Sequence, residues 1–126
     1  GHIRFVTDCD VVRFSRLGID LRPLLDDFAQ IVGAKIKTVE LDTDLIFSAL
    51  KSVSAVFVKD LGAVCRGQNE RDAEAVGMIV RKNCTAYFTA SALGRISYIP
   101  PGECDLMRKN YLGKYSLLSV ENRSRK

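Results

Sequence analysis

The sequence has no tryptophan and only one histidine, His2, which stands beside Gly1 at the start of the chain. A glycine and a histidine in place of an initial methionine are typical of the remnant of an expression tag. A catalytic imidazole must be held rigidly, and Ser–His or Cys–His nucleophile pairs would have no base elsewhere in this chain. The sequence therefore predicts no catalytic residue of these classes.

The cysteines form no C-x-x-C pair and are far apart in the sequence. This spacing argues against a zinc site and against a disulfide framework, and it favours reduced thiols that pack as small apolar side chains. No secretory leader precedes them. We therefore expect a cytoplasmic protein with free cysteines at positions Cys9, Cys65, Cys84 and Cys104.

No apolar run reaches the length of a membrane span, so we expect no membrane partner. The 126 residues, 47% hydrophobic and 27% charged, suit one globular domain, which we place at residues 1–118 with a polar tail at 119–126. The formal charge of +4 comes from Lys and Arg scattered along the chain. A nucleic-acid site needs basic residues focused on one element, so we expect no nucleic-acid partner.

The first part of the chain predicts alternating strands and helices. Ile3–Thr7 suits a strand, and residues 10–17 suit a short helix that Gly18 closes. Residues 22–33 suit a helix, with proline near its start and glycine at its end. Residues 34–40 alternate polar and apolar side chains, which is typical of a strand with one wet side at a sheet edge. Thr43 then suits the cap of a further helix.

The stretch Val56–Gly67 predicts a hairpin with the turn Asp60-Leu61-Gly62. Asn69 caps the longest predicted helix, 69–93, which has two apolar stripes. The first stripe consists of Ala73, Val76, Val80, Cys84, Tyr87 and Ser91, and the second of Ala75, Ile79, Ala86, Ala90 and Leu93. A helix that is apolar on two sides has two neighbours, so we expect it to contact both its own sheet and another subunit or domain. A last helix is predicted from Glu103 to about Tyr115.

These segments together resemble the second half of the class II aldolase/adducin family. The stretches that carry the resemblance are FVTDCDVVRFSRLG, RPLLDDFAQIVG, SAVFVKDLGAVCRG with the long helix behind it, and CDLMRKNYLGKYS. The resemblance implies an α/β fold of three layers, with a mainly antiparallel sheet flanked by helices and truncated on its N-terminal side. The family's first half, with its phosphate-binding segment and its acid/base glutamate, has no counterpart here.

In the enzymes of that family a His-x-His pair and a histidine of the hairpin turn hold a divalent metal, usually zinc. The resemblance places the pair at Phe5 and Thr7 and the turn histidine at Leu61. None of the three supplies an imidazole, so we expect no metal and no cofactor. The implied cleft beside them has as candidate lining residues Asp8, Asp60, Gly62, Tyr111 and Tyr115.

The sequence thus predicts a catalytically inactive, class II aldolase-like module that assembles as a dimer or tetramer. The cleft that the resemblance implies would bind a sugar phosphate or another small anion without turning it over. The alternative is a subunit or relative of a sugar-phosphate aldolase or epimerase, with a separate chain supplying the first half. That alternative does not restore the three histidines, which is why the inactive module is preferred.

Overall fold

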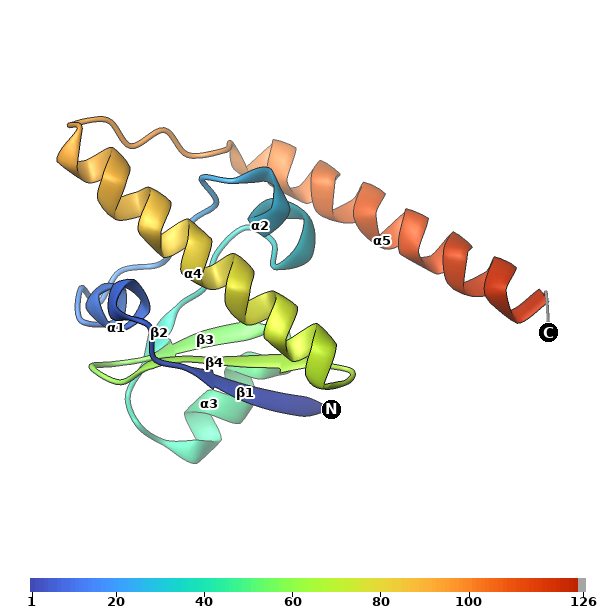
Figure 1. Cartoon of the computed structure of the whole chain (residues 1–126), viewed down its shortest axis with the longest axis horizontal. Helices are drawn as coiled ribbons and strands as arrows, with labels where there is room; N and C mark the ends of the chain where they lie inside the picture. The colour runs from blue at the N-terminus through green and yellow to red at the C-terminus, as the bar shows by residue number, and fades with distance from the viewer. Residues whose placement is uncertain (125–126) are drawn as a thin grey trace.

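The computed structural model describes the backbone of residues 1–124 and the side chains of residues 1–113. This part of the chain contains five helices and four strands (Figure 1). None of its helices is both long and apolar enough to cross a membrane. The elements are β1 (His2–Val6), α1 (Cys9–Ser15), α2 (Asp26–Ile31), β2 (Thr38–Val39), α3 (Thr43–Leu50), β3 (Ala55–Val58), β4 (Gly62–Gly67), α4 (Glu70–Ala92) and α5 (Pro101–Ser124).

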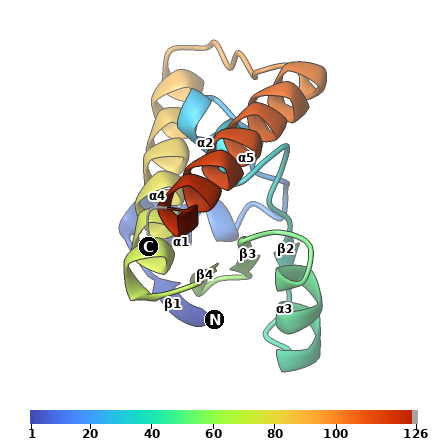
Figure 2. The same cartoon turned by 90° about the vertical axis from the view of Figure 1, so that its right-hand side faces the viewer.

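The four strands form one mixed sheet in the order β1-β4-β3-β2. β4 pairs antiparallel with both β1 and β3, whereas β2 pairs parallel with β3. Helices α1 and α4 lie over one face of the sheet and α3 lies over the other (Figure 2). The α/β architecture and the predominance of antiparallel pairing are as predicted.

The two faces of the sheet carry separate hydrophobic clusters because side chains alternate along each strand. The larger cluster lies under α1 and α4 and includes Phe57 and Cys65 of the sheet. Its centre is a group of rings in which Phe14 lies 5.1 Å from Phe57 and 5.0 Å from Tyr87, measured between ring centroids. The smaller cluster lies under α3 and consists of Ala49, Leu50, Val56, Val58 and Val64.

The long helix α4 follows the prediction closely. Asn69 accepts a hydrogen bond from the Asp72 N–H, and four residues of the first predicted stripe are buried against the sheet. The second stripe is only partly covered within the chain, and Leu93 at its end is 78% exposed. The four buried residues of the first stripe are Ala73, Val76, Val80 and Cys84.

Three predicted boundaries were wrong. The helix expected from residue 22 begins only at Asp26, because the Arg22 and Pro23 carbonyl oxygens, which would accept the first helical bonds, accept instead from Asn83 Nδ2 at 2.8 Å and from the Ile99 N–H at 3.0 Å. The Leu24 and Leu25 N–H groups donate to Asn83 Oδ1 of α4, at 2.9 and 3.2 Å. The strand expected at 34–40 shortens to β2, which does lie at a sheet edge. The cap of α3 is Asp42, whose carboxylate accepts from the Leu45 N–H, and Thr43 is the first helical residue.

The last helix is longer than predicted. α5 runs from Pro101 to Ser124, whereas the sequence placed its end near Tyr115. It packs on α2, where the Arg108 guanidinium donates to the Gln30 and Ile31 carbonyl oxygens at the C-terminal end of that helix. Beyond this contact α5 extends away from the sheet (Figure 1).

Candidate functional site

The hairpin between β3 and β4 makes a tight turn with two residues of positive φ. The Leu61 N–H donates to the Val58 carbonyl oxygen at 3.0 Å, while Asp60 has φ 68° and Gly62 has φ 136°. Aspartate tolerates this left-handed conformation better than most side chains, and glycine adopts it freely. The turn presents Leu61 to solvent with 41% of its surface exposed.

This turn lies directly against the end of β1. A Cβ atom at Gly62 would lie 2.2 Å from the Val6 carbonyl oxygen and 3.5 Å from the Thr7 Cα, so only glycine fits there. In the same ladder Phe5 stands opposite Val64. The structure therefore brings the three predicted positions Phe5, Thr7 and Leu61 to one place, where β1 ends beside the hairpin turn.

The side chains gathered at this junction do not fit a zinc ion. Zinc needs nitrogen, thiolate or carboxylate donors, whereas Phe5 and Leu61 offer hydrocarbon and Thr7 offers a hydroxyl. Within the described part of the chain, no three side chains of His, Cys, Asp and Glu are grouped so that they could hold a metal.

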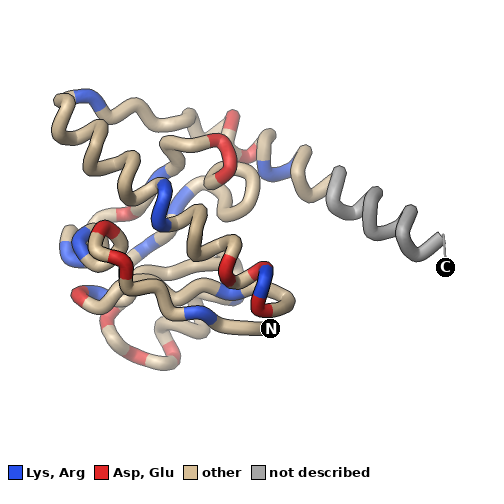
Figure 3. The backbone as a smooth tube through the Cα atoms, in the orientation of Figure 1, with Lys and Arg blue, Asp and Glu red and all other residues tan. Residues whose placement is uncertain are grey.

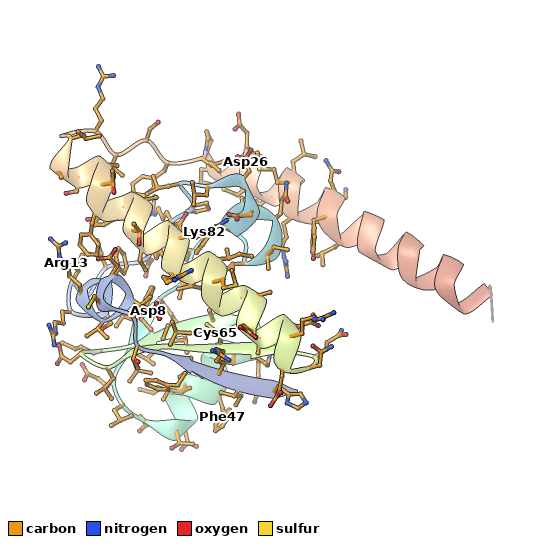
Figure 4. All side chains as sticks on the ribbon, in the orientation of Figure 1. Asp8, Arg13, Asp26, Phe47, Cys65 and Lys82 are labelled. Atoms are coloured by element: carbon orange, nitrogen blue, oxygen red, sulfur yellow. The ribbon has the colours of Figure 1, made fainter. Side chains whose placement is uncertain are left out.

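The carboxylates near the junction link helices. Asp8, which is labelled in Figure 4, has its Oδ2 3.7 Å from Arg81 Nη1. Asp10 accepts a 2.7 Å hydrogen bond from the Thr85 hydroxyl. Both contacts tie the start of α1 to α4. Neither places two carboxyl groups in the opposed environments that acid and base roles require.

The predicted cleft does not hold together as one site. Asp8, Asp60 and Gly62 belong to the junction, but Tyr111 of α5 lines a hollow of about 670 Å³ with Arg66 and Gly67, at the other end of β4. Tyr111 was therefore wrongly grouped with the junction, because the sequence did not show where α5 packs. Tyr115 lies outside the residues whose side chains are described.

Solved structures of aldolases share this arrangement of elements. L-fuculose 1-phosphate aldolase matches over 86% of this chain with a TM-score of 0.79 and 18% sequence identity. YgbL of Klebsiella pneumoniae and YgbL of Escherichia coli each match over 84%, with TM-scores of 0.70 and 0.69 and identities of 22% and 18%. The fold is that of the class II aldolases.

The chain spans about half the length of these aldolases, covering 54% of the first and 56% of each YgbL chain. No family model matches the sequence, and no curated protein matches it. The predicted resemblance is thus confirmed at the level of the fold. At such low identity the shared fold does not carry an activity with it.

A shallow groove of about 700 Å³ runs along α4, on the side away from the sheet of this aldolase fold. Its floor is apolar, with Ala86, Ala90 and Leu93, and three cationic side chains border it. Two of these already have partners, because Lys82 Nζ lies 2.5 Å from Asp27 Oδ2 and Arg81 contacts Asp8. The second apolar stripe was the signal for this groove in the sequence, although its basic border was not predicted.

Two thiols of the chain are buried and unreactive. Burial raises the pKa of the Cys65 thiol to about 12, and Arg4 opposes this only weakly. Burial also raises the pKa of Cys84, with a further contribution from the Asp10 carboxylate. Lys82 is half-exposed in its ion pair, so it lacks the desolvation that a Schiff-base amine needs.

Within residues 1–113, basic side chains do not gather on one element. Lys and Arg are spread over several helices, strands and loops and alternate with Asp and Glu (Figure 3). This distribution agrees with the scattered charge of the sequence.

Proposed function

We propose that this chain is a catalytically inactive class II aldolase-like module that associates with copies of itself in the cytoplasm. Its ligand, where it binds one, is a sugar phosphate or another small anion that it does not turn over. The resemblance would imply a sugar-phosphate lyase activity, and we propose that the chain lacks this activity.

One observation carries the proposal. The resemblance assigns three imidazoles to the positions of Phe5, Thr7 and Leu61, and none of these residues is a zinc ligand. Thr7 lies beside Gly62 of the hairpin turn, and Phe5 stands opposite Val64 in the ladder, which supports this assignment. In the enzymes of the family the metal acts as a Lewis acid that stabilises an enolate. Without donors at these positions the site that the resemblance implies would not hold that ion.

The proposal is supported by the state of the other reactive groups. Cys65 and Cys84 are buried thiols with raised pKa values, so neither is a thiolate near neutral pH. The carboxylates Asp8 and Asp10 are engaged with α4.

Self-association is supported by apolar surface that this chain leaves open. Leu93 at the end of α4 is 78% exposed, and Ile3 and Phe5 of β1 are about half exposed. Exposed apolar residues grouped on one element are typical of surfaces that contact another protein.

The test compares zinc binding by the wild type with a variant that restores the donors, Phe5→His/Thr7→His/Leu61→His. After equilibration with zinc and dialysis, metal content is measured by mass spectrometry. We expect no stoichiometric zinc in the wild type and about one ion per chain in the variant, since three converging imidazoles form a zinc site.

A matched control carries three histidines that do not converge, at the exposed apolar positions Met78, Leu93 and Leu106 on α4 and α5. This control is expected to bind no stoichiometric zinc. One tightly bound zinc ion per wild-type chain that protects residues 5–7 and 61 from hydrogen exchange would overturn the proposal.

The shared fold with L-fuculose 1-phosphate aldolase supports a second candidate, a subunit or relative of a sugar-phosphate aldolase or epimerase. This candidate predicts metal-dependent retro-aldol turnover of a sugar phosphate. Turnover by the wild type would establish it, and its absence with zinc, manganese and magnesium would count against it.

Ligand binding without turnover has its own test. A sugar phosphate present at a hundredfold over its dissociation constant stabilises the folded protein by about 2.7 kcal/mol. Thermal unfolding with inorganic phosphate and with fuculose 1-phosphate measures this shift. No shift with either would remove the ligand from the proposal and leave the self-associating module.

A further inference from the structure

A third cavity lies where the linker between α4 and α5, residues 93–100, crosses the segment before α2. It has a volume of about 460 Å³, and its described lining residues come from the stretches 22–23, 34–35 and 98–101. It shares none of these residues with the groove along α4 or with the hollow beside β4. Figure 1 shows the linker running alongside the segment that leads into α2.

Backbone hydrogen bonds fix the walls of this cavity. Leu21 and Ile36 exchange two bonds of 2.9 Å, so the stretches before and after α2 are tied to each other. The Ile99 N–H donates to the Pro23 carbonyl oxygen at 3.0 Å, which ties the linker to the same segment. Proline fixes its own φ, and the walls contain Pro23, Pro100 and Pro101. The cavity is therefore formed before a ligand arrives, which lowers the entropic cost of binding.

The lining of the cavity combines apolar walls with positive charge. Arg22 and Lys35 are its cationic residues, and among the described residues no carboxylate lines it. Ile99 and the prolines supply hydrocarbon, and Tyr98 adds an aromatic ring that is 38% exposed. Small-molecule sites typically have mostly apolar walls, a few polar groups and volumes of about 300 to 1,000 Å³. Size and composition both fit a small ligand with negative charge.

The polar groups of the lining are within reach of such a ligand. Burial raises the pKa of the Tyr98 hydroxyl and the nearby Arg22 guanidinium opposes this, so the phenol stays protonated and can donate a hydrogen bond. Lys35 Nζ lies 3.8 Å from Asp20 Oδ2, in an ion pair whose side chains are 63% and 39% exposed. An exposed pair of this kind is weak, so an anion can compete with Asp20 for Lys35.

We propose that this cavity is a binding site for a small organic anion. A carboxylate or phosphate head would lie between Arg22 and Lys35, and the apolar body of the ligand would rest on Tyr98 and the prolines. A guanidinium is suited to this role because its planar fork donates two parallel hydrogen bonds to either head. The site goes beyond the proposed function, since it uses no residue of the junction and depends neither on zinc nor on self-association.

Binding is tested by nuclear magnetic resonance of the ¹⁵N-labelled 126-residue chain. Phenyl phosphate and benzoate are titrated separately, because they share an aromatic body and differ in the anionic head. We expect saturable shifts of the amide signals of residues 20–22, 34–36 and 98–99, with a dissociation constant of about 1 mM or tighter for at least one of the two. The tighter of the two identifies the preferred head.

Two control compounds separate the contributions of charge and hydrocarbon. Benzylamine has the same ring and a positive charge, so we expect it to bind at least about tenfold more weakly than the preferred anion. Inorganic phosphate lacks the apolar body, and we expect it to bind at least about fivefold more weakly than phenyl phosphate. Equal affinity for the two phosphates would overturn the assignment of an organic ligand.

Variants test the two cations. Arg22→Gln changes only the side chain, so the backbone carbonyl that accepts from Asn83 keeps its bond. We expect it to weaken binding at least about tenfold, because it removes a charged hydrogen-bond donor. Lys35→Gln is expected to weaken binding about threefold or more. Lys51→Gln at the end of α3, which does not line the cavity, is the matched control and is expected to change the constant less than about twofold.

The position of the shifted signals separates this inference from the proposed function. Saturable shifts confined to residues 5–7 and 60–62 would place the anion at the junction, which overturns this site and supports the proposed ligand there. The absence of saturable binding by either anion overturns the site. So does binding that Arg22→Gln and Lys35→Gln both leave unchanged, provided that their thermal unfolding shows folded protein. Zinc content and oligomeric state are measured independently of all three outcomes.

Discussion

The two faces of the sheet differ in how completely they are covered. Under α1 and α4, 14 buried residues form one cluster, which includes a group of packed rings. Under α3 the cluster has five buried residues, and β1 is left without cover. The first face supplies most of the folding energy, because hydrophobic stabilisation grows with buried apolar area. The second face therefore leaves exposed surface that is free to contact another molecule.

Neighbouring residues of β3 provide the largest test of this difference. Phe57 faces the larger cluster and Val56 the smaller one, so the two share a backbone and differ in their surroundings. Phe57→Ala is expected to lower the free energy of unfolding by about 4 kcal/mol and Val56→Ala by about 2 kcal/mol, from lost burial and the cavity left behind. Urea unfolding measures both. Equal losses would mean that the α3 face is packed as tightly as the other.

The junction of β1 and the hairpin turn is expected to be nearly as sensitive. Gly62→Ala places a Cβ 2.2 Å from the Val6 carbonyl oxygen and demands a φ of 136° from alanine. We expect a loss of about 3 kcal/mol from strain and displacement of β1. Gly113→Ala, whose added Cβ meets open space on α5, is the control. It is expected to be neutral or to stabilise by up to about 1 kcal/mol. An unchanged midpoint for Gly62→Ala would show that β1 and the turn are not closely apposed.

Asn83 connects α4 to the segment before α2, and its removal is expected to cost about 2 to 3 kcal/mol. The buried amide accepts from Leu24 and Leu25 and donates to the Arg22 carbonyl oxygen at 2.8 Å. Asn83→Ala leaves these backbone groups without their partner. Asn69→Ala removes one exposed capping bond and is expected to cost only about 1 kcal/mol. Similar losses for the two variants would contradict the assigned role of Asn83.

Thiol labelling sharpens the comparison without altering stability. Cys65 lies in the larger cluster with a pKa raised to about 12, so it stays protonated and shielded at pH 8. Cys9 is exposed on α1. We expect iodoacetamide to label Cys9 in the folded protein and Cys65 only after unfolding, as read by peptide mass spectrometry. Labelling of Cys65 at the rate of Cys9 would show that the covered face opens readily.

Much of this fold could be predicted from the sequence because periodicity is strong where elements are long or fully buried. The hairpin and the α4 helix with its Asn69 cap were located correctly, since each combines clear boundaries with a regular apolar pattern. The start of α2 was missed because two distant groups, the Asn83 amide and the Ile99 N–H, donate to the carbonyl oxygens that would have accepted the first helical bonds. No local pattern contains that information.

The candidate site was predictable to a similar degree. The approach of Phe5 and Thr7 to the turn that holds Leu61 depends on one strand pairing and one glycine turn, and both can be recognised in the sequence. The place of Tyr111 depends on how α5 packs against α2, which no spacing within α5 specifies. The groove along α4 was visible only as an apolar stripe, because its basic border comes partly from Arg95 beyond the end of the helix.

The ring cluster around Phe14 also gives the molecule a convenient optical signature. The chain contains no tryptophan, so its near-ultraviolet dichroism comes from tyrosine and phenylalanine. Tyr87 is held edge-on to Phe14, with ring centroids 5.0 Å apart, so among the four tyrosines it supplies a contribution from the covered face of the sheet. An indole introduced in place of Phe5 would be the sole source of tryptophan emission, so the two faces could be followed separately in one sample.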